Sequence, residues 1–290
     1  MSEQYGILVG VDGSAESDAA VRWATREATL RDELITLLHV VAPVVASWPM
    51  TPMHESITKW QKENAWEVIE QARKTLFAEV GESPPEVHAE VLYSHVVPTL
   101  IDASKQARMV VAGSRGMGAV GRFLMGSVSA GLVHHAHCPV AVIHPEEASA
   151  ANQNAPVLLG IDGSPASEAA TAWAFDEALC QRVPLVALHV WSDVGVLPIV
   201  GTDWREYESQ GEEVLAERLA GWQENYPDVH VRRRLECDQP VRWLLEESDH
   251  AQLVVVGSHG RGGFAGMTLG SVSAAVAQSA KVPVIVVRSR

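Results

Sequence analysis

The sequence has little that would place the protein outside a reducing compartment or in a membrane. Its three cysteines, Cys138, Cys180 and Cys237, form no CxxC pair, which argues against a disulfide framework or a zinc site. It has no run of about eighteen apolar residues and no basic-then-apolar segment at its start, so we expect a cytoplasmic protein without membrane insertion. The net charge of −14 disfavours nucleic acid and anionic membranes as partners.

Motifs for common nucleotide enzymes are also missing or incomplete. No Gly-Lys-[Ser/Thr] of a Walker loop is present, and no nucleophile, base and orienting group stand out as a set, so fast phosphoryl transfer is poorly supported. The segment 116–121 formally spells GxGxxG. It lacks the acidic residue expected about 20 positions later, and the second half of the chain does not keep it, so it is weak evidence for NAD.

What is present describes a duplicated globular chain. At 290 residues, with 47% hydrophobic and 20% charged residues, it is long enough for two domains with cores of their own. Three motifs occur in both halves: Asp12-Gly-Ser14 and Asp162-Gly-Ser164, Leu38-His-Val40 and Leu188-His-Val190, Gly126-Ser-Val-Ser-Ala130 and Gly270-Ser-Val-Ser-Ala274. We predict a first domain at 1–145, a linker at 146–155 and a second domain at 156–290.

Each copy alternates apolar strand patterns with amphipathic helix patterns. In the first copy we expect strands at 7–11, 34–41, 87–92, 109–112 and 139–143, with helices beginning at Ser14 and spanning 56–80, 97–106 and 127–136. This order predicts an α/β fold: two tandem Rossmann-like domains, each a five-stranded parallel sheet with helices on both faces and the flavodoxin-like order 3-2-1-4-5. Such sheets bind ligands where the strand order reverses, which would bring Asp12 to Gly113 and Asp162 to Gly257.

Glycine-rich loops follow the fourth strand of each copy. Gly113-Ser-Arg-Gly116 is followed by Gly126-Ser127, and Gly257-Ser-His-Gly260 by Gly270-Ser271 at the same spacing. Strand, glycine loop and helix N-terminus form a phosphate site, because glycine lets the backbone approach an anion and the first-turn N–H groups point at it. We therefore predict half of a nucleotide site at each loop.

The Gly-x₂-Gly-x₉-Gly-Ser spacing, the aspartate after the first strand and the Leu-His-Val motif resemble the universal stress protein family. The tandem form resembles its ATP-binding actinobacterial members. The resemblance covers nearly the whole chain. It implies one ATP per domain, with or without Mg²⁺, and a non-catalytic role in stress response, dormancy or growth. A slow ATPase or a nucleotidyl-transferring enzyme is the alternative. A third hypothesis is a scaffold protein whose glycine loops bind no nucleotide.

The resemblance assigns an aspartate to ribose and adenine, a strand-2 valine to adenine and the glycine loop to phosphate. The candidate ATP-binding residues of domain 1 are Gly10, Asp12, Val40, Gly113, Ser114, Arg115, Gly116, Met117, Gly118, Ala119, Gly126, Ser127 and Val128. Those of domain 2 are Gly160, Asp162, Val190, Asp193, Gly257, Ser258, His259, Gly260, Arg261, Gly262, Gly263, Gly270, Ser271 and Val272. Arg115 and Arg261 are included because guanidinium suits phosphate. The two loops differ at one equivalent position, which is Arg115 in the first copy and His259 in the second.

Each of these signals also has a purely structural explanation. The aspartates would serve equally as turn carboxylates, the arginines as solvated charges, and His39 and His189 as core histidines. The run His134, His135, His137 and Cys138 resembles a metal cluster, but the second copy does not keep it and a helix C-terminus favours histidine. Beyond a nucleotide, we expect an unknown regulatory protein partner and homo-oligomers formed through the last strand of each copy, 139–143 and 283–287.

Overall fold

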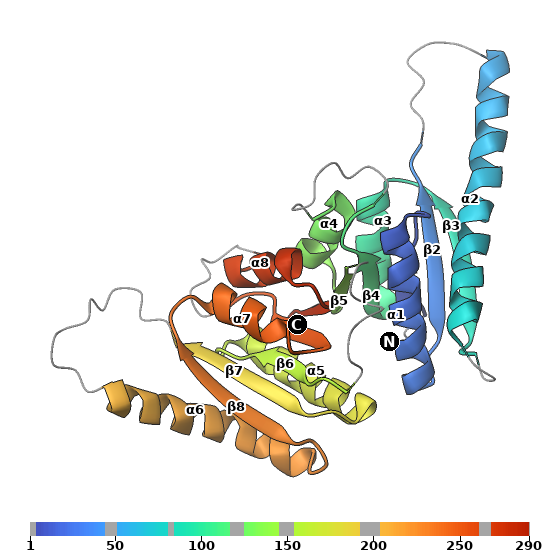
Figure 1. Cartoon of the computed structure of the whole chain (residues 1–290). Helices are drawn as coiled ribbons and strands as arrows, with labels where there is room; N and C mark the ends of the chain where they lie inside the picture. Colours follow the sequence, from blue (N-terminus) through green and yellow to red (C-terminus); the bar gives the residue numbers. More distant parts are fainter. Residues whose placement is uncertain are drawn as a thin grey trace. The chain divides into compact units, whose positions relative to one another are not determined.

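The chain folds into two compact units, Met1–Ala148 and Ser149–Arg290, called unit 1 and unit 2 below (Figure 1). The structure is a computed structural model that describes residues 4–43, 51–80, 84–116, 125–144, 154–191, 204–260 and 268–289, with backbone alone at 51–60, 62, 204–210 and 214. The predicted linker, 146–155, lies almost entirely outside the described residues, and its limits remain a prediction.

Unit 1 is a parallel sheet with helices between its strands. In chain order its elements are β1 Gly6–Gly10, α1 Ala15–Arg31, β2 Ile35–Val41, α2 Thr51–Glu79, β3 Val87–Tyr93, α3 Val96–Ala103, a 3₁₀ turn Ser104–Gln106, β4 Ala107–Gly113, α4 Ser127–His135 and β5 Val140–Ile143. The strand order is β3-β2-β1-β4-β5, and every pair within the unit is parallel. The predicted flavodoxin-like order is confirmed.

Unit 2 repeats this architecture. Its elements are β6 Val157–Gly160, α5 Pro165–Gln181, β7 Leu185–Trp191, α6 Trp204–Asn225, β8 Val231–Cys237, α7 Pro240–Ser248, β9 Leu253–Gly257, α8 Ser271–Ser279 and β10 Val284–Val287. The order β8-β7-β6-β9-β10 is again parallel throughout and equals 3-2-1-4-5 within the unit. The sequence repeat is therefore a repeat of the whole set of strands and helices in the same order.

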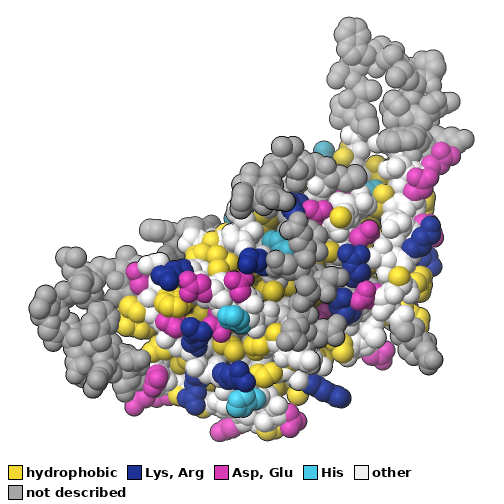
Figure 2. All heavy atoms as spheres, in the orientation of Figure 1, with side chains coloured by type: hydrophobic (Ala, Val, Ile, Leu, Met, Phe, Trp, Pro, Cys, Tyr) yellow, Lys and Arg dark blue, Asp and Glu magenta, His cyan; other side chains and the backbone are white. Residues whose placement is uncertain are grey.

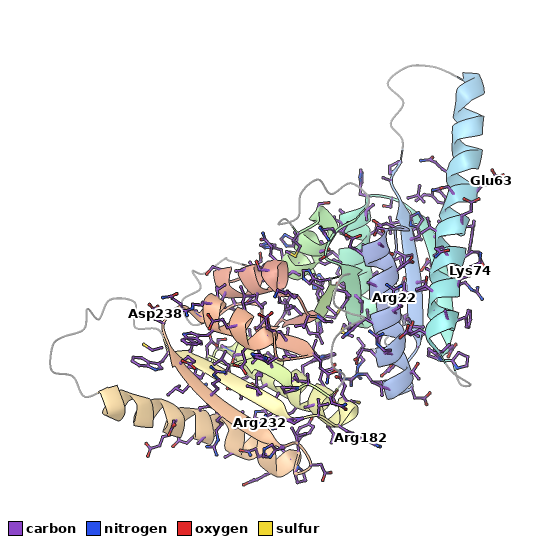
Figure 3. The ribbon with its side chains drawn as sticks, viewed as in Figure 1. Arg22, Glu63, Lys74, Arg182, Arg232 and Asp238 are labelled. Atoms are coloured by element: carbon purple, nitrogen blue, oxygen red, sulfur yellow. The ribbon has the colours of Figure 1, made fainter. Side chains whose placement is uncertain are left out.

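Helices cover both faces of the sheet in unit 1. α1 packs against α2 on one face, and α3 packs against α4 on the other (Figure 1). The inner side of α2 is a buried stripe at helical spacing, made of Ala65, Ile69, Ala72 and Leu76. Charged residues such as Glu63 and Lys74 project from the helix away from the sheet (Figure 3).

Caps in the sequence set where the first helix of each unit begins. The Ser14 side chain accepts from the Ser17 N–H at 3.1 Å, and the Ser164 side chain accepts from the Ser167 N–H at 3.2 Å, as the N-cap pattern predicted. The helix predicted at 97–106 instead changes to a 3₁₀ turn at Ser104. The Ser104 hydroxyl donates to the Ile101 carbonyl at 2.6 Å, a local bond that competes with the α-helical ladder.

The outer surface carries charges of both signs. On the face drawn in Figure 2, the described Lys and Arg side chains are interspersed with Asp and Glu. That part of the surface therefore offers no continuous basic track for a polyanion. Among the described residues, no helix combines the length and the apolar character needed to cross a membrane.

Phe175 anchors the packing of α5 in unit 2, and its loss should be costly. It is fully buried and stacks on Trp222 of α6, with ring centroids 5.9 Å apart. We predict that Phe175→Ala lowers the free energy of unfolding by about 3–5 kcal/mol, because it leaves a cavity. Leu179→Ala, one turn further along α5 and 41% exposed, is the control and should cost less than about 1 kcal/mol. Urea unfolding followed by circular dichroism measures both, and equal effects would contradict this packing.

Candidate functional site

The aspartate after the first strand holds the turn that leads into the helix. Asp12 Oδ1 accepts from the Ser14 N–H at 3.0 Å and from the Ser14 hydroxyl at 2.6 Å. Asp162 Oδ1 accepts from the Ser164 N–H at 2.9 Å. The interpretation of both aspartates as turn carboxylates is therefore correct for one oxygen of each.

The other carboxylate oxygen faces the glycine loop. A Cβ built on Gly116 would lie 2.6 Å from Asp12 Oδ2, and a Cβ on Gly260 would meet Asp162 Oδ2 in the same way. A side chain at either glycine would displace the carboxylate. The end of the first strand and the loop after the fourth strand, distant in sequence, thus meet in each unit as the topology predicted.

Hydrogen bonds tie the next helix to the same place. The Gly126 N–H donates to the Ser114 carbonyl at 2.8 Å, and the Ser129 hydroxyl donates to the Gly113 carbonyl at 2.5 Å. Unit 2 repeats both bonds, from Gly270 to Ser258 at 2.7 Å and from Ser273 to Gly257 at 2.5 Å. The loop therefore returns to the end of the fourth strand of its unit, and the N-terminus of α4 or α8 lies beside that strand end.

The N-caps of these two helices are glycines, which supply no side-chain acceptor. Gly126 and Gly270 make no side-chain cap bond, and the candidate residues Ser127, Val128, Ser271 and Val272 form the first turns. First-turn N–H groups have no acceptor within their own helix. This arrangement suits an anion.

Gly113 and Gly257 have a packing role that the sequence did not suggest. Their predicted role, a close approach of the backbone to phosphate, stays a prediction. A Cβ on Gly113 would lie 2.7 Å from the backbone carbon of Glu16, and one on Gly257 would lie 2.7 Å from that of Ala166. These glycines allow the first turn of α1 or α5 to pack on the end of the fourth strand.

Arg115 forms an ion pair with the first helix. Its Nη2 lies 3.1 Å from Glu16 Oε1, and the side chains are only 24% and 18% exposed. Arg115 is therefore not a solvated loop charge. In unit 2 the matching positions are His259 and Ala166, and His259 Nδ1 lies 2.9 Å from the Ser258 hydroxyl.

The strand-2 histidines are structural. His39 Nδ1 lies 2.7 Å from the Val11 carbonyl oxygen, and His189 Nδ1 lies 2.6 Å from that of Ile161. Each joins the second strand to the end of the first, as expected of a core histidine. Val40 and Val190 follow them at the same sheet edge, and Gly10 and Gly160 end the first strands.

Several predicted residues lie outside the described residues: Met117, Gly118, Ala119, Asp193, Arg261, Gly262 and Gly263. His134 and His135, two members of the run that resembles a metal cluster in the sequence, occupy the last turn of α4. In the part of the chain that the structure describes, no three His, Cys, Asp or Glu side chains are arranged to hold a metal ion.

Sequence reasoning missed two side chains near the site, Glu16 and Arg218. Arg218 of α6 lies against Gly163 and pairs with Glu168 at 3.4 Å, whereas the matching contact on Gly13 in unit 1 comes from Val68. Neither Glu16 nor Arg218 is repeated in the other copy, so no motif marked them. Glu16 lies four residues after Asp12, in the helix that begins at the aspartate motif. This position was the one signal in the sequence that could have indicated that Glu16 lies near the site.

Comparison with known proteins places this site in a family. The model of the universal stress protein family matches residues 6–144 and again 154–288, which together cover most of the chain. The chain belongs to the universal stress protein family. Each match spans one unit with its aspartate turn, its glycine loop and the helix that follows.

Family members with the same tandem layout are found in mycobacteria. A universal stress protein of Mycolicibacterium smegmatis is 61% identical over 288 residues, covering 99% of this chain and 98% of its own. One of Mycobacterium tuberculosis is 52% identical over 289 residues, covering 99% and 97%. The crystal structure of a universal stress protein from Archaeoglobus fulgidus matches with a TM-score of 0.72 at 22% identity, covering 99% of this chain and 100% of that one, and shows the same fold.

Adding a methyl group at Gly113 should destabilise unit 1, because the Cβ would collide with the backbone of α1. We predict that Gly113→Ala lowers the free energy of unfolding by about 1–3 kcal/mol. Gly221→Ala in α6 is the matched control, since nothing lies within 4 Å of its Cβ. It should raise stability by about 0.5–1 kcal/mol. Urea unfolding compares the two, and a Gly113→Ala protein as stable as the parent would refute the packing role.

Proposed function

We propose that each unit binds one ATP at the site formed by its aspartate turn, its glycine loop and the N-terminus of the helix that follows. The phosphates would lie at the first turn of α4 or α8, the ribose at Asp12 or Asp162, and the adenine beside Val40 or Val190. The remaining candidate residues of both loops belong to the same proposal, including those outside the described residues.

The observation that carries this proposal is the meeting of Asp12 Oδ2 with Gly116, repeated by Asp162 and Gly260. A carboxylate can accept from ribose hydroxyls, and it stands beside a loop that leads to a glycine-capped helix. One site therefore offers an acceptor for the sugar and N–H donors for the phosphates.

A buried hydroxyl also fits a site that a ligand completes. Ser114 Oγ is buried and has no hydrogen-bond partner among the described residues. Buried polar groups in folded proteins are normally satisfied. A phosphate oxygen or a Mg²⁺-bound water would supply the missing partner in unit 1.

The same geometry favours a regulator over an enzyme. His39, which lies beside the end of the first strand, has its Nδ1 engaged by the Val11 carbonyl, and the chain has no Walker lysine. We propose that bound ATP alters the contact of the protein with a regulatory partner in stress response, dormancy or growth. The cytoplasmic location and the self-association through terminal strands remain predictions.

The direct test is the amount of nucleotide bound. Isothermal titration of nucleotide-free protein with ATP should give two bound molecules per chain, and mass spectrometry of the denatured, freshly purified protein should identify the ligand it carries. Phosphate release measured in parallel tests the ATPase alternative. A chain that binds no ATP would refute the proposal and favour the hypothesis of a scaffold protein.

Gly116→Ala separates binding from folding. Its Cβ would meet Asp12 Oδ2, the end of a side chain and not a backbone, so we expect a smaller loss of stability than from Gly113→Ala but a fall from two bound ATP molecules to one. Asp12→Ala should weaken the unit 1 site by about 1–3 kcal/mol through lost charge-assisted hydrogen bonds. Gly221→Ala is the control and should keep both sites. If the Gly116→Ala protein still binds two ATP molecules with parental affinity, the proposed role of the glycine loop in binding is wrong.

A further inference from the structure

Beside the glycine loop, a pair of charged side chains in unit 1 is not repeated in unit 2. Unit 1 has the Glu16–Arg115 ion pair, and unit 2 has Ala166 and His259 instead. Both residues of the ion pair are thus replaced in unit 2.

The two pairs occupy equivalent places. Cβ atoms built on Gly113 and Gly257 meet the backbone of Glu16 and Ala166 respectively. Cβ atoms built on Gly126 and Gly270 lie 3.2 Å from the Cα atoms of Arg115 and His259. The difference between the units is therefore one of side chains on a common backbone frame.

Arg115 begins beside the helix where the phosphates would bind but points elsewhere. Its Cα adjoins Gly126, the N-cap of α4, while its guanidinium reaches Glu16 in the first turn of α1. To pair with a phosphate at α4, the guanidinium must leave or share the carboxylate. The carboxylate is itself a negative charge close to the incoming anion, and partial burial limits its screening by salt.

We propose that Glu16 competes with the nucleotide phosphates for Arg115 and so holds down the affinity of unit 1. The proposal rests on the proposed function and adds a residue that sets affinity in one unit. Unit 2 has no such competitor, because Ala166 carries no charge. Each unit has one such aspartate, Asp12 in unit 1 and Asp162 in unit 2, so this residue does not distinguish them.

The test is Glu16→Gln, which keeps the size of the side chain and removes its charge. It is made in a Gly260→Ala background, which should remove the unit 2 site as Gly116→Ala removes that of unit 1, so that ATP titration reports unit 1. We expect ATP to bind about tenfold more tightly, the effect of one neighbouring charge, and most of the gain to persist as salt rises, because the carboxylate is partly buried. If Glu16 instead positions Arg115 for the phosphate, Glu16→Gln binds more weakly, and unchanged or weaker binding overturns the proposal.

Two further variants show whether Glu16 acts through Arg115. Asp18→Asn removes a charge from the same helical turn, where Asp18 accepts from Thr75 at 3.3 Å, and should change affinity by less than about twofold. In an Arg115→Gln background most of the gain from Glu16→Gln should disappear. An equal gain from Asp18→Asn, or a gain that persists without Arg115, would overturn the competition.

The same titrations separate this proposal from the one on which it rests. If the Gly260→Ala protein with Glu16 intact shows no saturable ATP binding, both proposals fail. If it binds one ATP and Glu16→Gln does not tighten that binding, only the competition fails.

Discussion

The close approach of α1 to the end of β4 is the constraint on which each unit depends. It is possible because Gly113 has no side chain, and Gly257 allows the same approach in unit 2. With that helix in place, the Asp12 turn lies against Gly116, and the loop returns to β4 through the Gly126 N–H. The proposed binding site is thus a consequence of how the helix packs, because the same turn starts the helix and presents the carboxylate.

The aspartate turn combines a structural and a binding role in one side chain. Asp12 Oδ1 is used by Ser14 to start α1, and Oδ2 faces the loop. The two interpretations that the sequence left open are therefore compatible. Such an arrangement keeps the carboxylate oriented before a ligand arrives, which lowers the entropic cost of binding.

Duplication gave two copies of one backbone frame, and side chains at its edge have since come to differ. Around the loop, unit 1 has an arginine paired with a carboxylate, whereas unit 2 has a histidine beside a serine. Around the turn, unit 1 has Val68 where unit 2 has Arg218. Charge differs between the copies while Gly113 and Gly257 are kept, because a glycine that admits a neighbouring backbone tolerates no side chain.

The strand order, the helix starts at Ser14 and Ser164, and the meeting of aspartate and glycine loop could be predicted from the sequence, because periodicity, caps and topology rules are local or follow from chain order. Which neighbour each glycine meets could not be predicted and depends on the folded arrangement. Gly113 and Gly116 look alike in the sequence, yet one touches a helix backbone and the other a carboxylate. The folded arrangement also decided that Arg115 reaches Glu16, ninety-nine positions away by their numbering, since a pair formed across folded segments leaves no periodic trace in the chain.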